Sequence, residues 1–273
     1  MIMKTNNDET VFPTYFISHG GGPWFWLEEQ KPFYANLKKS LRAMPAEVGS
    51  TPKAILVVSG HWEEDDFAVM TRPQPPMIYD YVGFPEHTYR VKYDAPGSPE
   101  IAARVLELLR NAGFETHGDA ERGFNHGTFV PLAAAYPAAD VPVLELSIRK
   151  DYDPETHLAV GRVLAPLRRE GVLIVGSGLS YHNLRQFGAQ ARVPSHEFDR
   201  WLTEAVCESA AGERSEKLRR WANAPSARLA HPREDHLIPL MVAVGAAETE
   251  SGERVYHEDA FFGGIAVSSY RFG

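Results

Sequence analysis

The stretch "YFISHGGGPWF", residues 15–25, joins an apolar run to a histidine, three glycines and a proline. Such a run is typical of a buried β-strand, and we expect that strand to span residues 14–18. The strand would fix the position of His19. Glycines without a Cβ would then let the backbone turn sharply and let a ligand come close. The stretch therefore predicts a buried strand that delivers a histidine to a ligand site.

Outward from this strand, apolar β-type runs alternate with amphipathic helical stretches. The run "KAILVVSG" (53–60) predicts a second buried strand that is rich in β-branched residues. The segment 98–113 has a serine N-cap, an early proline and a terminal glycine, which are the signals of a helix. We expect further strands at 66–71, 141–148, 172–178 and 264–272, and further helices at 31–43, 128–137, 153–171, 195–222 and 235–247.

Strands that alternate with helices predict an α/β fold. We expect a single-domain sandwich with a central, mostly parallel sheet that is covered by helices on both faces. We place no domain boundary, so one catalytic domain would span residues 1–273. The segment 72–97, rich in proline, tyrosine and glycine, is expected to be a long loop or a pair of short elements. Loops of that length are often functional.

Charge and composition exclude several classes of partner. A formal net charge of −8 argues against nucleic acid or an anionic membrane as the main partner. No apolar run is long enough to span a bilayer, and the first residues lack the apolar segment of a signal peptide. The single cysteine, Cys207, excludes a disulfide within the chain and a cysteine-based zinc site. We expect a cytoplasmic protein that is a monomer or a homo-oligomer.

Three of the 11 histidines lie at or just beyond the ends of predicted strands. His19 and His61 follow their strands directly, and His182 follows its strand after a short Leu-Ser-Tyr link. Parallel strands would bring these imidazoles to one edge of the sheet, where ligands bind in open α/β folds. The pattern therefore predicts a shared metal site. Imidazole suits iron, zinc, copper and nickel, so the histidines alone do not choose among these metals.

The other histidines divide into two groups. His126 lies between a glycine-bearing turn and a short helix, and His236 opens the apolar helix. His231 precedes His236 by five residues with a proline between them, and we expect it at the rim of the site. The rest lie in predicted loops or on charged helix faces, where we expect surface positions: His87, His117, His157, His196 and His257.

Seven segments, taken in order, resemble the class III extradiol ring-cleaving dioxygenases, the superfamily of the protocatechuate 4,5-dioxygenase catalytic subunit. They cover nearly the whole chain. The Gly-Phe-Pro and Ala-Pro-Gly-Ser-Pro segments are similar to the DOPA 4,5-dioxygenase-like branch. The segments are "SHGGGP" (18–23), "VVSGHWEE" (57–64), "YDYVGFPEHTYRVKYDAPGSPE" (79–100), "GFNHGTFVPL" (123–132), "VPVLELSI" (141–148), "VGSGLSYHNLR" (175–185) and "DHLIPLMVAVGA" (235–246).

The resemblance implies an α/β sandwich that cleaves an aromatic diol with O2. It implies Fe(II) as the functional metal, with zinc bound in some isolated proteins of this branch. His19, His61 and His236 would be metal ligands. His182 would be the acid/base histidine, close enough to be a further metal ligand, and His126 would hold the substrate or the bound oxygen. Histidine suits both proton transfers because its ordinary pKa is about 6.5.

Two positions depart from the family pattern. Better-known members complete the metal site with one carboxylate, and no glutamate is evident for that role. The nearest acidic residues are Asp235, Glu63 and Glu64. Asn125 stands where an aspartate is common, and that aspartate would orient the pocket histidine. The ligand set implied here is thus richer in histidine than the usual triad.

The sequence offers several candidates for contact with the substrate. Trp24 and Tyr181 are the first candidates for binding the substrate ring, and ordinary core packing is the alternative for each. Arg185 is a candidate for binding a substrate carboxylate. Other aromatic residues near the expected entrance are Phe25, Tyr79, Tyr81 and Phe84.

Two other functions use the same histidines. A zinc-dependent hydrolase could bind Zn²⁺ there and lower the pKa of bound water toward ~7. A metal-binding protein without activity is a third possibility, although glycines and apolar walls around the histidines favour an open pocket. "HGGGP" resembles the oxyanion motif of some esterases, yet the chain lacks the G-x-S-x-G elbow that carries their nucleophile.

Overall fold

The computed structural model describes residues 11–273, and within that range eight strands form one mixed sheet. Its strand order is β4-β3-β5-β2-β6-β1-β8-β7. The central strands β5, β2, β6 and β1 are parallel to one another, whereas β8 pairs antiparallel with β1 and with β7. The predicted α/β fold with a mostly parallel central sheet is confirmed. The strands are β1 (Thr14–Ser18), β2 (Ala54–Glu64), β3 (Phe67–Met70), β4 (Thr116–Asp119), β5 (Val143–Arg149), β6 (Val172–Gly178), β7 (Gly252–Phe261) and β8 (Ile265–Phe272).

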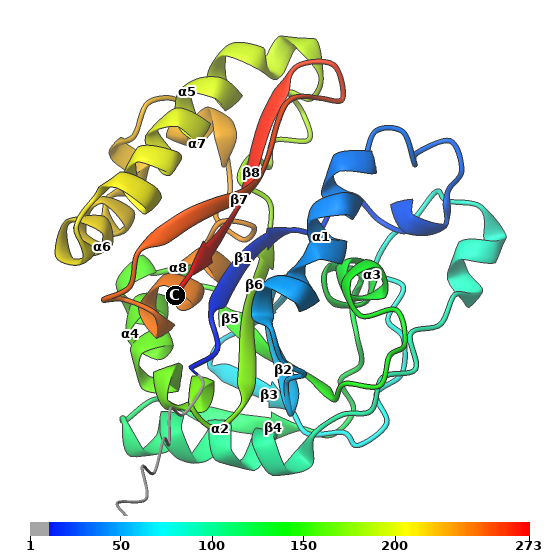
Figure 1. Cartoon of the computed structure of the whole chain (residues 1–273), viewed down its shortest axis with the longest axis vertical. Coiled ribbons are helices and arrows are strands. Elements are labelled where there is room, and N and C mark those ends of the chain that lie inside the picture. Colours follow the sequence, from blue (N-terminus) through cyan, green and yellow to red (C-terminus); the bar gives the residue numbers. More distant parts are fainter. Residues whose placement is uncertain (1–10) are drawn as a thin grey trace, which may run out of the picture.

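Helices cover both faces of the sheet, as Figure 1 shows. On one side α1 and α3 pack together, and on the other α8 lies on β1 and β6 with α4 outside it. This cover explains why the central strands are apolar on both faces. In the part of the chain described, no helix combines the length and apolar character needed to cross a membrane. The helices are α1 (Ala35–Val48), α2 (Pro99–Asn111), α3 (His126–Ala135), α4 (Pro154–Leu164), α5 (Arg192–Thr203), α6 (Ala211–Arg219), α7 (Ala227–Ala230) and α8 (Ile238–Ala246).

Local sequence signals account for several of these elements. The Ser98 hydroxyl accepts a hydrogen bond from the Ile101 N–H at 3.4 Å and caps α2, as its sequence predicts. Asp153 caps α4 in the same way through the Thr156 N–H at 2.9 Å. The segment 72–97 is a long loop with one short 3-10 helix, and this loop reaches the histidines described below.

One predicted helix is wrong. The stretch 195–222 is not continuous, because α5 is followed by a single turn of π-helix and the backbone is extended at Ser209 before α6 begins. This break lets α6 bury the Arg214 guanidinium, which donates hydrogen bonds to the carbonyls of Glu248 and Glu250. Strands β4 and β7 were not predicted, because their largely exposed, polar residues lack an apolar run.

Two histidines expected at or near the surface are fully buried. His157 donates from Nδ1 to the Asp153 carbonyl at 2.7 Å, and its Nε2 accepts from the Arg149 N–H at 3.1 Å. His231 packs against aromatic rings and donates from Nε2 to the Ser180 carbonyl at 2.9 Å. Backbone partners make burial possible for a neutral imidazole. The predicted surface position of His157 and the predicted rim position of His231 are therefore wrong.

Candidate metal centre

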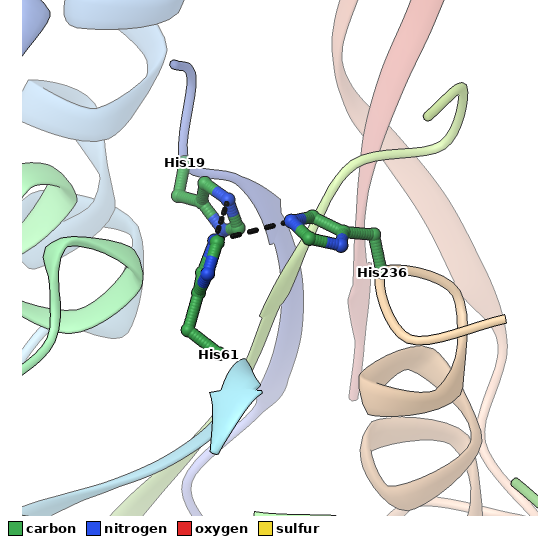
Figure 2. Close-up of side chains that lie close together, drawn as sticks. All are labelled: His19, His61 and His236. Carbon is green, nitrogen blue, oxygen red and sulfur yellow. Dashed lines mark hydrogen bonds between the residues drawn. The ribbon is translucent and has the colours of Figure 1, made fainter. Parts of the chain in front are cut away.

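Three histidines from distant parts of the chain turn their Nε2 atoms toward one another. His19 follows β1, His61 lies on β2, and His236 precedes α8. The His61 Nε2 lies 3.1 Å from the Nε2 of His19 and 3.1 Å from that of His236 (Figure 2). His61 was expected after its strand, but β2 continues to Glu64 beyond a register shift that follows Val58.

The partners of the outer ring nitrogens fix which atom carries the hydrogen. The Ser177 hydroxyl donates to the Gly127 carbonyl, so it accepts from the Nδ1–H of His19 at 3.1 Å. The Nδ1–H of His236 faces a carboxylate oxygen of Asp235 at 2.9 Å. The rings of His19 and His236 therefore each point an Nε2 lone pair at His61. Such outer partners are the usual companions of metal-binding histidines.

Direct hydrogen bonds do not account for this cluster. An imidazole has at most one hydrogen on Nε2, so His61 satisfies only one of the two lone pairs that face it. Burial lowers the pKa of His61 to about 3, and burial together with the neighbouring histidines lowers the pKa of His19 and His236 well below the ordinary value. A divalent cation with metal–nitrogen bonds of about 2 Å fits three neutral nitrogens at this spacing. The donor set suits iron, zinc, copper or nickel.

The turn after β1 explains the glycines of the opening motif. Gly20 has φ of +77°, and a Cβ there would lie 2.4 Å from the Trp24 Nε1. The Trp24 indole donates to the His19 carbonyl at 2.7 Å and stacks on Tyr34 at 4.6 Å between centroids. Trp24 is fully buried and does not line the cavity, so its predicted contact with substrate is wrong. It holds the turn that carries His19.

A second glycine lets His236 approach the sheet. A Cβ on Gly178 would lie 2.0 Å from the carbonyl oxygen of His236. The same carbonyl accepts a hydrogen bond from the Leu179 N–H at 3.1 Å. The segment before α8 therefore sits directly on the end of β6, and this contact brings His236 to the two strand histidines.

His182 lies beside the three histidines. Its ring stacks on that of His236 with 3.4 Å between centroids, and its Nδ1 is 3.9 Å from a carboxylate oxygen of Asp235. Burial lowers the pKa of His182, while the charge of Asp235 opposes that shift. Among the potential metal-binding atoms, a nitrogen of His182 lies close to atoms of both Asp235 and His236, but it does not belong to the group formed by His19, His61 and His236. His182 therefore lies beside the three-histidine cluster without joining it.

His126 opens α3 and faces the same space. Its ring centroid lies 4.0 Å from that of His61, and its Nδ1 is 2.8 Å from Asp80. The backbone N–H of His126 donates to the same carboxylate at 2.9 Å. The other Asp80 oxygen lies 3.4 Å from the His61 Nδ1, so one carboxylate contacts two histidines. Burial raises the pKa of Asp80, but the two hydrogen bonds from His126 and the charges of His126 and His61 together outweigh burial and lower this pKa.

The acidic partners differ from those considered in the sequence. Asp80 orients the pocket histidine, while Asn125 turns away to bind Glu145 at 2.9 Å. Glu63 binds Tyr152 and Arg233, outside the cluster. Sequence reasoning missed Asp80. Its signals were its place in the long loop expected to be functional and in the family-like segment 79–100.

A cavity of about 370 Å³ opens above the histidines. The glycine turn after His19 forms part of its lining. Tyr181 is fully buried with its hydroxyl donating to the Gln186 carbonyl at 2.8 Å, so its predicted substrate contact is wrong. Arg185 is exposed and does not line the cavity, so it does not fill the role suggested for it. The aromatic residues that line the cavity are Tyr34, Phe84, Phe187, Phe261 and Phe262.

Only one of these five was expected near the entrance. Phe84 was named from the sequence, whereas Phe261 and Phe262 lie at the turn between β7 and β8. That turn was not anticipated because β7 was not predicted. Phe25, Tyr79 and Tyr81 pack with the core and do not line the cavity.

Comparisons with known proteins agree with this geometry. The chain is 40% identical over 271 residues to a 4,5-DOPA dioxygenase extradiol of Beta vulgaris, covering 97% of this chain and 98% of the relative. It is 38% identical over 280 residues to a protein of the same name from Portulaca grandiflora, covering 99% of each. An uncharacterized protein from Escherichia coli K12, known from a crystal structure, superimposes with a TM-score of 0.77 at 27% identity over 96% of this chain and 100% of that one. Residues 13–273 match the description "Catalytic LigB subunit of aromatic ring-opening dioxygenase", and the chain therefore belongs to that family.

Proposed function

We propose that this protein is an Fe(II)-dependent extradiol dioxygenase that opens the ring of a catechol with O2. His19, His61 and His236 would hold the metal. The observation that carries the proposal is the convergence of three Nε2 atoms, 3.1 Å apart in successive pairs, at the base of an aromatic cavity. The names of the two plant relatives make DOPA the first catechol to test.

The chain's own residues suggest how the reaction would proceed. Bound Fe(II) would supply Lewis acidity for the diol and electron transfer between the diol and O2. His182 would take a proton from a catechol hydroxyl at Nε2, while its Nδ1 faces Asp235. His126 would bring a proton at Nε2 to the O–O bond as it breaks, because Asp80 holds its Nδ1. The aromatic walls would limit the access of water to these steps.

The test begins with apoprotein loaded anaerobically with Fe(II). A catechol such as DOPA is added, air is admitted, and both the yellow semialdehyde product and oxygen uptake are recorded. We expect one O2 consumed for each ring opened, and no uptake by the same protein loaded with zinc. Product formation without oxygen uptake would indicate hydrolysis instead. Lack of product from a whole panel of catechols would overturn the proposal.

A further inference from the structure

The wall of the cavity carries no cationic side chain among residues 11–273. Beyond the histidines and glycines, its lining consists of aromatic and aliphatic residues with one amide, Gln30, and one phenol, Tyr34. The Tyr34 oxygen accepts a hydrogen bond from the Gly21 N–H at 2.9 Å. A carboxylate that entered this space would meet no arginine or lysine to pair with it.

The cations nearest in sequence to the cavity lining are directed elsewhere. Arg185 follows the lining residue Leu184, but its own side chain is exposed and outside the cavity. Lys31, which follows the lining residue Gln30 in the sequence, forms an ion pair with Glu28. For either residue to supply a cation to the substrate, its side chain would have to leave this position.

Fixed negative charge lies at the base of the cavity. Asp80 contacts His126 and His61, and Asp235 contacts His236. Both carboxylates are largely buried, so water screens them poorly. With a divalent cation bound, these two carboxylates offset its charge, so the base of the cavity offers a second carboxylate no net positive charge.

The mouth of the cavity is also apolar. Leu184, which is 71% exposed, lines it, and Phe262 stacks on Phe33, which is 50% exposed. Phe262 has φ of +47°, a left-handed conformation that is unfavourable for a residue with a Cβ. The turn between β7 and β8 thus accepts backbone strain and keeps a phenyl ring in the wall. Exposed apolar groups gathered at a pocket indicate an apolar ligand.

We infer that the enzyme prefers catechols whose ring carries an uncharged, apolar substituent over catechols that carry a carboxylate. This inference rests on the proposed function. The diol must face the histidines, so the substituent extends toward the aromatic wall and Leu184. A short alkyl chain would bury apolar area there, whereas a carboxylate would lose its hydration without gaining a partner.

The test compares two substrates of equal chain length, 4-propylcatechol and 3-(3,4-dihydroxyphenyl)propionate. With the Fe(II)-loaded enzyme, we expect kcat/KM from oxygen uptake to be roughly tenfold or more higher for 4-propylcatechol, because an unpaired carboxylate in an apolar pocket is costly. Equal values, or a preference for the carboxylate, would overturn the inference while leaving ring cleavage established.

Binding to the metal-loaded protein without oxygen separates the inference from the proposed function. If neither catechol is cleaved, the proposed function fails, but calorimetric titration still measures the order of affinity. Tighter binding of 4-propylcatechol would support the inference. Weaker or equal binding, or no binding of either compound, would overturn it.

Substitution of Leu184 at the mouth of the cavity tests whether an added cation improves turnover of the carboxylate compound. Leu184→Arg places a cation beside the cavity at an exposed position, so we expect the preference for 4-propylcatechol to shrink. The matched Leu184→Gln variant is polar but uncharged and should not improve turnover of the carboxylate compound. Arg185→Gln should leave the ratio unchanged. A ratio that rises in Arg185→Gln would show that Arg185 already binds the carboxylate, and the inference would fall.

Discussion

The carboxylate of Asp235 lies 2.9 Å from Nδ1 of His236, its immediate neighbour in the sequence. This contact fixes a hydrogen on Nδ1 and so turns the Nε2 lone pair toward His61. The second oxygen of Asp235 lies 3.9 Å from Nδ1 of His182, too far for a hydrogen bond, and has no hydrogen-bond partner within the described chain. One side chain therefore connects a proposed metal ligand with the proposed acid/base residue.

Replacement of Asp235 by asparagine should weaken metal binding. The amide is uncharged and can present N–H in place of oxygen, so it no longer enforces the productive tautomer of His236. We expect a roughly 10- to 100-fold rise in the dissociation constant for Zn²⁺ or Fe(II), measured by competition with a chelator. Asp65→Asn, at an exposed position, is the control. An unchanged dissociation constant would contradict the role given to Asp235.

His61 is the central member of the three-histidine cluster, so His61→Ala should abolish stoichiometric metal binding. Only this ring has its Nε2 within 3.1 Å of both others. Metal content after dialysis, measured by elemental analysis, should fall to the background of the apoprotein. His87→Ala removes an exposed histidine and should bind metal as the unmodified protein does. Full retention of metal by His61→Ala would refute the site.

His182→Ala should separate metal binding from turnover. The ring stacks beside His236, and its nitrogens do not join the group formed by His19, His61 and His236. We expect most of the metal to remain while kcat falls by roughly 10²- to 10⁴-fold, the usual contribution of a general acid or base. If metal content and activity fall together, His182 is a ligand after all.

Gly178→Ala should disturb the site through the backbone. The new Cβ would lie 2.0 Å from the His236 carbonyl, which has no room to retreat while α8 packs on the sheet. We expect a loss of about 1–3 kcal/mol in the free energy of unfolding together with weaker metal binding. Gly212→Ala, where nothing lies within 4 Å, is the matched control and should be neutral or slightly stabilising. Equal stability of the two variants would contradict the close packing.

Burial of His157 predicts a dependence of stability on pH. Burial lowers its pKa from 6.5 to about 4 in the folded protein, so between these values the unfolded chain binds a proton that the folded chain does not. The contribution of the neutral ring to the free energy of unfolding is complete above pH 6.5. As the pH falls toward 4, this contribution of about 3 kcal/mol is lost. His157→Gln should reduce this slope in urea unfolding measured across that range. The same slope in both proteins would contradict the assignment.

The sequence determined the elements that carry their own local signals. The buried strands were predicted from their apolar runs, and α2 was predicted from its serine cap and early proline. Because parallel strands end at one edge, the positions of His19 and His61 after such runs were enough to predict that they meet. Family resemblance added His236 as an expected ligand, but no local pattern placed that ring beside the other two.

Only the tertiary structure decided the contacts between segments that are distant in the chain. Packing of α8 against Gly178 positions His236, a long loop delivers Asp80 to two histidines, and the β7–β8 turn supplies the aromatic wall. Burial of His157 also depends on the backbone N–H of Arg149, which lies at the end of β5 only eight residues earlier. Periodicity and capping reflect interactions within a few residues. The meeting of the strand histidines could therefore be predicted from the sequence, whereas their partners and the shape of the pocket depended on the folded chain.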